Sequence, residues 1–150
     1  MKVQALGHVV LKVRNLDRAI AFYGGVLGMP VVARERIRGY PMAFFSVTGN
    51  HHDFALLEVG GDDTPPLPFE TPGLAHLAFK LGDDLDTLRD AREHLARHGV
   101  AVDRTVDHRV SQSLYVRDPD GHTVELYVDA DPSMWREDAS AVAHSEPFTL

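Results

Sequence analysis

Residues 7–31 read GHVVLKVRNLDRAIAFYGGVLGMPV, and residues 73–102 read GLAHLAFKLGDDLDTLRDAREHLARHGVAV. Both stretches open on a similar segment, HVVLKV from His8 and HLAFKL from His76, with histidine first, lysine fifth and an apolar residue sixth. The second segment starts roughly 70 residues after the first, a spacing too long for a solenoid repeat and suited to a duplicated module. The repeat therefore predicts two copies of one structural unit.

Each opening segment predicts a strand that leads through a polar turn into a helix. Asn15 or Asp17 is expected to cap the first helix, and Asp83 or Asp84 the second. Apolar residues then recur at helical spacing. They are Leu16, Ile20, Tyr23 and Leu27 in the first copy, and Leu85, Leu88, Ala91 and Leu95 in the second.

Glycines indicate where the helices end. Gly28 and Gly99 stand where a C-terminal glycine belongs, whereas the pair Gly24 and Gly25 disfavours the first helix and predicts an early end. Three strand-like segments follow each helix, so each half is expected to fold as βαβββ. Their ranges are 30–36, 42–48 and 53–59 in the first half, and 101–106, 113–117 and 123–128 in the second.

The sequence thus predicts one α+β domain over residues 1–150, built from two βαβββ modules and a tail. The expected boundaries are about 4–60 for module one, 61–72 for the linker, about 73–130 for module two and 131–150 for the tail. Residues 60–72, GGDDTPPLPFETP, are rich in the turn formers Gly, Pro and Asp. The tail lacks a clear period and is expected to pack on the body or on a partner subunit.

Composition excludes several classes of function. The absence of cysteine rules out disulfides, thiolate metal sites and a cysteine nucleophile, so any metal must bind nitrogen and oxygen. A net charge of -7 with no basic stripe argues against nucleic acid as a partner. No apolar run approaches the roughly 20 residues that span a bilayer, and the N-terminus reads as a strand rather than a signal peptide. We therefore expect a cytoplasmic protein with no membrane partner.

Three residues are candidate metal ligands. His8 and His76 hold the same place in their modules, and a pseudo-twofold axis between the modules would bring them face to face. Glu125 is the one acid in the apolar strand 123–128, where a buried carboxylate is costly unless it is paired or binds a cation. Two imidazoles and a carboxylate form the facial triad of non-haem Fe(II) sites; Mn(II), Zn(II) or Ni(II) also suit it. Taken singly, each histidine has a structural role as the alternative, and for Glu125 the alternative is a solvent-facing position at a sheet edge.

Residues 106–125, VDHRVSQSLYVRDPDGHTVE, carry a further candidate. Asp-Pro-Asp-Gly at 118–121 predicts a tight turn, because proline presets φ and glycine supplies a positive φ. The turn would join the strands of Tyr115 and Glu125 in a hairpin, which places Tyr115 near the metal. A core aromatic with a satisfied hydroxyl is the alternative interpretation.

This organisation resembles the vicinal-oxygen-chelate superfamily of glyoxalases, bleomycin-resistance proteins and ring-cleavage dioxygenases, over roughly residues 4–130. The run of a histidine, then Leu-Tyr, then Asp-Pro-Asp-Gly and Glu is similar to the more specific signature of type I extradiol dioxygenases. The resemblance implies a glyoxalase-like fold in which His8, His76 and Glu125 bind iron. It also implies that Tyr115 and His108 hold substrate or support proton transfer.

A second match is HDFAL at residues 52–56, which is similar to an extradiol strand whose histidine acts as acid–base beside bound oxygen. The resemblance implies that role for His52; a polar turn after Asn50 is the alternative. Aligning residues 51–55 on residues 121–125 makes Ala55 the equivalent of Glu125, so the first module lacks the fourth ligand of glyoxalases. Glu58 lies an odd number of residues away and is expected on the opposite strand face.

The expected activity is Fe(II)-dependent extradiol cleavage of a small aromatic diol by O2, in a pocket walled by residues such as Val10, Phe44 and Phe45. Two alternatives stay open: a glyoxalase-like metal-dependent lyase or isomerase, and a non-catalytic small-molecule binding protein of the bleomycin-resistance kind. The resemblance also implies a homodimer, in which the apolar tail residues can take part. These are Trp135, Phe148 and Leu150.

Overall fold

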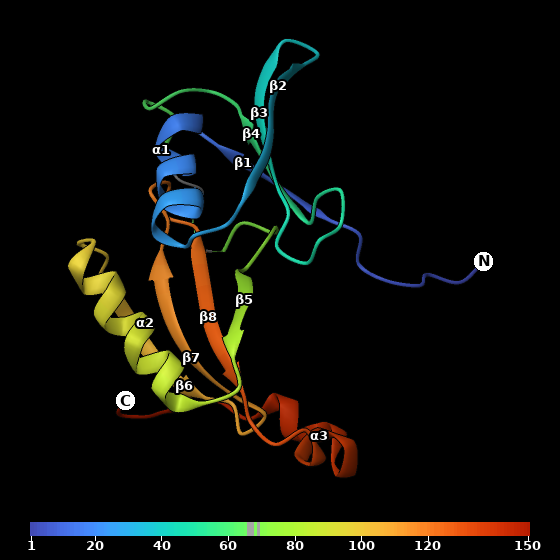
Figure 1. The fold of residues 1–150 in the computed structure, drawn as a ribbon, viewed down its shortest axis with the longest axis vertical. Helices are drawn as coiled ribbons and strands as arrows, with labels where there is room; N and C mark the ends of the chain where they lie inside the picture. Colours follow the sequence, from blue (N-terminus) through green and yellow to red (C-terminus); the bar gives the residue numbers. More distant parts are fainter. Residues whose placement is uncertain (66–67, 69) are drawn as a thin grey trace. The chain divides into compact units, whose positions relative to one another are not determined.

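The computed structural model describes residues 1–65, 68 and 70–150, which form two compact units, Met1–Pro68 and Phe69–Leu150. Each unit folds as βαβββ around one mixed sheet, which confirms the predicted α+β class (Figure 1). The predicted linker at 61–72 includes residues 66, 67 and 69, which lie outside the described residues. That both units form one domain stays a prediction.

In the first unit the sheet has the strand order β1-β4-β3-β2, with β1 parallel to β4 and the other pairs antiparallel. Its elements are β1 (Val9–Val13), α1 (Leu16–Ile20), η1 (Ala21–Val26), β2 (Val31–Ile37), β3 (Tyr40–Phe45) and β4 (Phe54–Glu58). Asn15 is the N-cap of α1, and its side chain accepts a hydrogen bond from the Arg18 amide at 3.0 Å. The cap follows the prediction, and β3 begins two residues earlier than expected.

The first helix changes its winding before the glycine pair. The α-helical part ends at Ile20, and the chain continues as the wider π-helical segment η1, in which the Leu27 amide donates to the Phe22 carbonyl at 2.9 Å. The α-helix therefore ends early, as predicted, but the chain stays helical through the glycine pair as η1. Gly28 then ends the segment with φ +69°, a conformation that suits a residue without a Cβ.

The core of the first unit is aromatic. Tyr23 from η1 and Phe45 from β3 are fully buried, and both pack on Phe54, with ring centroids 4.9 and 5.7 Å apart. Leu11 and Val13 of β1 are also buried, whereas His8, Val10 and Lys12 alternate onto the other face of the sheet. One face of this sheet therefore holds the core, and the other face carries His8.

The second unit has the sheet order β5-β8-β7-β6-β9, with β5 parallel to β8 and the other pairs antiparallel. Its strands are β5 (Leu77–Gly82), β6 (Val102–Asp107), β7 (Ser111–Arg117), β8 (Thr123–Asp129) and β9 (Glu146–Pro147); its helices are α2 (Leu85–Arg97), α3 (Ser133–Glu137) and η2 (Ala139–Ala143). Asp84 caps α2, because its side chain accepts from the Thr87 amide at 2.8 Å. Gly99 follows α2 with φ +69°, as expected for its C-terminal glycine.

Helix α2 covers one face of the second sheet (Figure 1). Its buried residues Leu88 and Leu95 pack on alternate residues of β7 and β8 that are likewise buried. These strand residues are Leu114, Val116, Val124, Leu126 and Val128. Because strand residues alternate, residues 113, 115 and 125 point to the face that α2 leaves uncovered.

The tail forms short helices and returns to its own sheet. After α3 and η2, strand β9 pairs with β6, with Val106 opposite Pro147 and Asp107 opposite Glu146. Of the two expectations for the tail, packing on the body is confirmed; a homodimer contact stays a prediction. In the described part of the chain, no helix combines the length and apolar character needed to cross a bilayer.

Candidate metal centre

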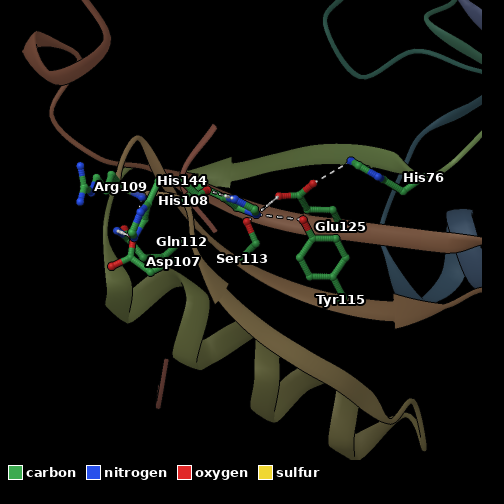
Figure 2. Close-up of polar contacts among 9 residues, drawn as sticks. All are labelled: His76, Asp107, His108, Arg109, Gln112, Ser113, Tyr115, Glu125 and His144. Carbon is green, nitrogen blue, oxygen red and sulfur yellow. Dashed lines mark hydrogen bonds and ion pairs between the residues drawn. The ribbon is translucent and has the colours of Figure 1, made fainter. Parts of the chain in front are cut away.

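The second unit holds a buried carboxylate, Glu125, in the middle of β8. Its side chain is 9% exposed, and each of its two carboxylate oxygens contacts a polar atom of another side chain. Oε1 accepts a hydrogen bond from Ser113 Oγ at 2.6 Å, and Oε2 lies 3.1 Å from His76 Nε2 (Figure 2). His108 Nε2 lies 3.8 Å from Oε1. Two of the three predicted ligands, His76 and Glu125, are thus brought together.

Strand register explains why these two residues meet. Glu125 stands opposite Ala78 of β5 on one side and opposite Tyr115 of β7 on the other. His76 lies two residues before Ala78 and so points to the same face of the sheet. The turn at 118–121 forms the predicted hairpin: the Asp118 carboxylate accepts from the His122 amide at 2.8 Å, and its other oxygen contacts His122 Nδ1 at 2.8 Å. His122 therefore serves the turn.

Tyr115 and His108 form a second polar pair beside Glu125. The Tyr115 hydroxyl lies 3.0 Å from His108 Nε2, and His108 Nδ1 lies 2.8 Å from the carbonyl of His144 (Figure 2). Burial and then the nearby Glu125 charge raise the pKa of Tyr115 to about 12, so the hydroxyl is protonated at neutral pH. The Arg104 guanidinium lies over the Tyr115 ring, 4.0 Å from its centroid. Tyr115 is thus a neutral hydrogen-bonding group, and it stands opposite Glu125 as the hairpin predicted.

The turn between β6 and β7 holds His108. The His108 amide donates to the Ser111 carbonyl at 2.8 Å, and the Asp107 side chain accepts from the Arg109 amide at 2.7 Å and from the Gln112 amide group at 3.1 Å. Arg109 has φ 63°, a left-handed conformation that a turn imposes at some cost in a residue with a Cβ. These contacts anchor the backbone on both sides of the imidazole.

Histidines also gather in the first unit. The rings of His8, just before β1, and His52, just before β4, have centroids 4.4 Å apart, and His51 Nδ1 lies 2.7 Å from His52 Nδ1. Desolvation and the neighbouring His8 lower the pKa of His52, which favours a neutral ring. Asp53 holds the preceding loop, because its carboxylate accepts from the amides of Val47 and Thr48 at 2.7 and 2.8 Å.

The register of the first unit confirms the alignment of the repeats. Val10 stands opposite Ala55 just as Ala78 stands opposite Glu125, so Ala55 occupies the equivalent position. Glu58 points elsewhere, since its Oε2 accepts from the Leu16 amide at the start of α1 at 2.7 Å. The first unit therefore places no carboxylate at the position that corresponds to Glu125.

The expected apolar wall is partly wrong. Phe44 pairs with Ala55, which pairs with Val10, and the Phe44 ring meets His52 edge-on at 5.3 Å. These residues share the face that carries His8. Phe45 points the other way and is fully buried against Phe54 in the core, because neighbouring strand residues alternate.

The donors of the second unit fit part of a divalent metal site. Two neighbouring ligands on an ion with bonds of about 2.1 Å are about 3 Å apart. The 3.1 Å between His76 Nε2 and Glu125 Oε2 matches that separation, and imidazole with carboxylate suits Fe(II), Mn(II) or Zn(II). Within either unit taken by itself, the described residues include no group of three candidate ligands. His8 belongs to the other unit, so its place in the triad stays a prediction.

Sequence reasoning missed Ser113 and the His144 carbonyl. Ser113 is fully buried and is the direct partner of Glu125. A signal for it was present, because a lone serine two residues before Tyr115 in an apolar strand shares the face of Tyr115. The His144 carbonyl had no such signal, since any residue type supplies a carbonyl.

Comparison with known proteins gives the same picture. A sequence model described as the Glyoxalase/Bleomycin resistance protein/Dioxygenase superfamily matches residues 5–126. The chain is 36% identical, over 96% of its length, to a biphenyl-2,3-diol 1,2-dioxygenase 3 from Rhodococcus globerulus, and 31% identical, over 89%, to a catechol-2,3-dioxygenase from Bacillus subtilis. It spans 72% of the first relative's length but 44% of the second's.

A solved structure extends the likeness to the fold. The glyoxylase/bleomycin resistance protein/dioxygenase domain from Frankia sp. EAN1pec superposes with a TM-score of 0.74 at 26% identity, covering 87% of this chain and 96% of that one. The repeat, the hairpin register and these matches agree with one another. This chain belongs to the Glyoxalase/Bleomycin resistance protein/Dioxygenase superfamily.

Proposed function

We propose that this protein is an Fe(II)-dependent extradiol dioxygenase that opens a catechol-type ring with O2. In this proposal His76 and Glu125 bind the iron, with His8 as the third ligand. The observation that carries the proposal is the polar face of the second unit, where the His76–Glu125 pair lies beside the hydrogen-bonded pair Tyr115–His108. The similarity to two proteins named as diol dioxygenases supports the same reaction class.

A site with three protein ligands rather than four favours ring cleavage over glyoxalase chemistry within the superfamily. Ala55 holds the position in the first unit that Glu125 holds in the second, and Glu58 is occupied at the start of α1. A site with two imidazoles and one carboxylate leaves coordination positions for both substrates. Bound iron would supply Lewis acidity and a template that holds the diol and O2 together.

The protein's own side chains would position the substrate and move protons. Tyr115 is protonated at neutral pH, and its hydroxyl would form a hydrogen bond with a hydroxyl group of the diol. His52 is the proposed acid–base group, because desolvation and then the neighbouring His8 lower its pKa and leave a neutral ring that can take up a proton. Phe44 meets His52 edge-on and would provide an apolar wall for an aromatic ring.

The test is oxygen uptake by protein loaded with Fe(II) under anaerobic conditions and then given a panel of catechols. We expect uptake with a yellow ring-opened product, lost in His76→Ala and retained in His98→Ala. His98 is a matched control because its ring contacts His94 on helix α2, away from the polar face. Calorimetric titration with Fe(II) runs in parallel, so that metal binding is measured separately from turnover.

Each other outcome favours a named alternative. Metal binding that needs His76, without uptake on any catechol, would move the function to a metal-dependent lyase or isomerase. No metal binding at all would refute the metal centre and favour a small-molecule binding protein. His8→Ala tests the third ligand, and we expect it to weaken Fe(II) binding as His76→Ala does.

A further inference from the structure

The C-terminal segment, residues 138–148, is held along the free edge of β6. The side chain of Asp138 accepts from the Ser140 amide at 2.9 Å and starts η2, in which Ala141 is buried. Strand β9 then pairs with β6, and the Thr105 hydroxyl donates to the Phe148 carbonyl. The burial of Ala141 before His144 and the pairing of β9 after it hold the segment on the unit, which places the His144 backbone beside the turn that carries His108.

The contact between the two histidines determines where the His108 proton lies. His108 Nδ1 is 2.8 Å from the His144 carbonyl, and a carbonyl oxygen can only accept a hydrogen bond (Figure 2). Nδ1 therefore carries the hydrogen, and in the neutral ring Nε2 has the lone pair. Tyr115 OH lies 3.0 Å from that nitrogen, so the tyrosine hydroxyl donates to His108.

We propose that the C-terminal segment is a positioning element of the site, which uses the His144 carbonyl to hold His108 as its Nδ1–H tautomer. The hydroxyl hydrogen of Tyr115 is then directed at His108 Nε2, and its oxygen lone pairs are left to accept a hydrogen bond. The ligand group that suits this arrangement is an O–H donor, such as a phenolic hydroxyl. This last step rests on the proposed function, whereas the tautomer does not.

The segment's effect passes through a short chain of contacts. His108 is 20% exposed and touches both Tyr115 and, at 3.8 Å, Glu125. Without the carbonyl, His108 loses the acceptor that selects its tautomer, and an Nε2–H ring would instead donate to Tyr115. The hydroxyl hydrogen of the tyrosine would then turn to another acceptor, either Glu125 or the ligand. One backbone carbonyl therefore sets whether the Tyr115 hydroxyl donates a hydrogen bond to His108 or accepts one from it.

The deciding experiment is a nitrogen-15 spectrum of the imidazoles in the intact, metal-free chain at pH 8, above the ordinary imidazole pKa of about 6.5. The couplings of each ring nitrogen to the ring hydrogens distinguish the two tautomers, and His108→Gln assigns the resonance. We expect His108 to be the Nδ1–H tautomer. An Nε2–H tautomer, or a mixture like that of a free histidine, would overturn the proposal without any further variant.

Two variants separate the carbonyl from the side chain of His144. His144→Ala removes the ring, which lies 3.7 Å from Glu146, but keeps the carbonyl, so the His108 tautomer should not change. A chain ending at Glu137 removes the carbonyl, and the Nδ1–H signature should be lost. A folded truncated chain that keeps the signature would refute the role of the segment. If it does not fold, the intact-chain spectrum decides.

Turnover is measured last and is kept separate from the tautomer. In iron-loaded protein, truncation should lower kcat by about 10-fold or more, the usual effect of losing an outer-shell partner, while His144→Ala retains it. The expected tautomer with no oxygen uptake by the intact chain would refute the proposed function alone. Uptake without the expected tautomer would refute this inference alone.

Discussion

Ser113 is the residue whose removal should most directly show how the site is held. Its side chain is fully buried on β7, and its hydroxyl donates to Glu125 Oε1 at 2.6 Å. In Ser113→Ala that oxygen loses its 2.6 Å hydrogen bond, and His108 Nε2 at 3.8 Å is too far away to replace it. The buried Glu125 carboxylate thus loses one of its donors while it keeps its contacts with Tyr115 and His76, and its orientation toward His76 is less constrained.

Two magnitudes follow from this loss. A hydrogen bond to a charged group contributes about 1.5–3 kcal/mol, so metal-free Ser113→Ala should be less stable by about that amount. Loss of an outer-shell partner typically weakens metal binding by about 10- to 100-fold, which is about 1.4–2.7 kcal/mol. Urea unfolding of the metal-free protein measures the first effect, and Fe(II) titration calorimetry measures the second.

Ser140→Ala is the matched control for this change. Ser140 Oγ donates to Asp138 Oδ1 at the same 2.6 Å, but the contact is exposed and the Ser140 amide also reaches that oxygen. Its removal should change stability by no more than about 0.5 kcal/mol and leave metal binding unchanged. Equal effects of the two substitutions, or unchanged metal affinity in Ser113→Ala, would refute the reasoning that burial and Glu125 orientation make Ser113 important.

Three further predictions concern stability. Hydrogen bonds from the 47–50 loop hold the pKa of Asp53 below its ordinary value, so the stability that Asp53 contributes is present above about pH 4 and is lost as pH falls below that. Asp53→Asn should therefore lower the urea midpoint at pH 7 and reduce the fall of that midpoint between pH 7 and pH 3. A variant whose midpoint falls with pH as steeply as that of the original protein would contradict this. Leu88 of α2 is fully buried, whereas Leu85 is 38% exposed. In urea unfolding, Leu88→Ala should lower the free energy of unfolding by about 2–5 kcal/mol and Leu85→Ala by clearly less. Equal losses in the two variants would rule out the packing of α2 described above. Gly99 has φ +69° with open space where an added Cβ would lie, so Gly99→Ala should lower stability by about 1–2 kcal/mol through backbone strain alone. Gly25 in η1 is equally open but lacks a positive φ, so Gly25→Ala should raise stability by up to about 1 kcal/mol. Thermal unfolding in which both variants shift stability in the same direction would disprove the role of the positive φ.

Local patterns explain why so much of the fold could be predicted. Alternation within strands, helical spacing and caps such as Asn15 and Asp84 involve residues that are close in the chain. The hairpin at 118–121 depends on four consecutive residues, and once it forms, Tyr115 must stand near Glu125. The equivalence of Ala55 and Glu125 followed from the repeat alone, and the strand registers bear it out.

Features that depend on competing local preferences were harder to predict. The pair Gly24 and Gly25 indicated where the first helix weakens, yet it did not reveal the π-helical winding of η1. That winding depends on backbone hydrogen bonds between residues five apart in the chain, such as Leu27 to Phe22, which no single residue type specifies. Phe44 and Phe45 are both apolar, and only the strand's register decides which one enters the core.

The sequence by itself determined the class of fold, the repeated βαβββ unit, and the residue types that can bind a metal. Tertiary structure alone decided that Ser113 holds Glu125 and that the His144 carbonyl meets His108, across 12 and 36 residues of chain. The physical reason is the distance along the chain over which each kind of interaction acts. Periodicity and turn chemistry act between near neighbours and leave a mark on composition, whereas a contact between distant segments depends on how strands align. A backbone carbonyl leaves no mark on composition, so only the folded chain reveals its role.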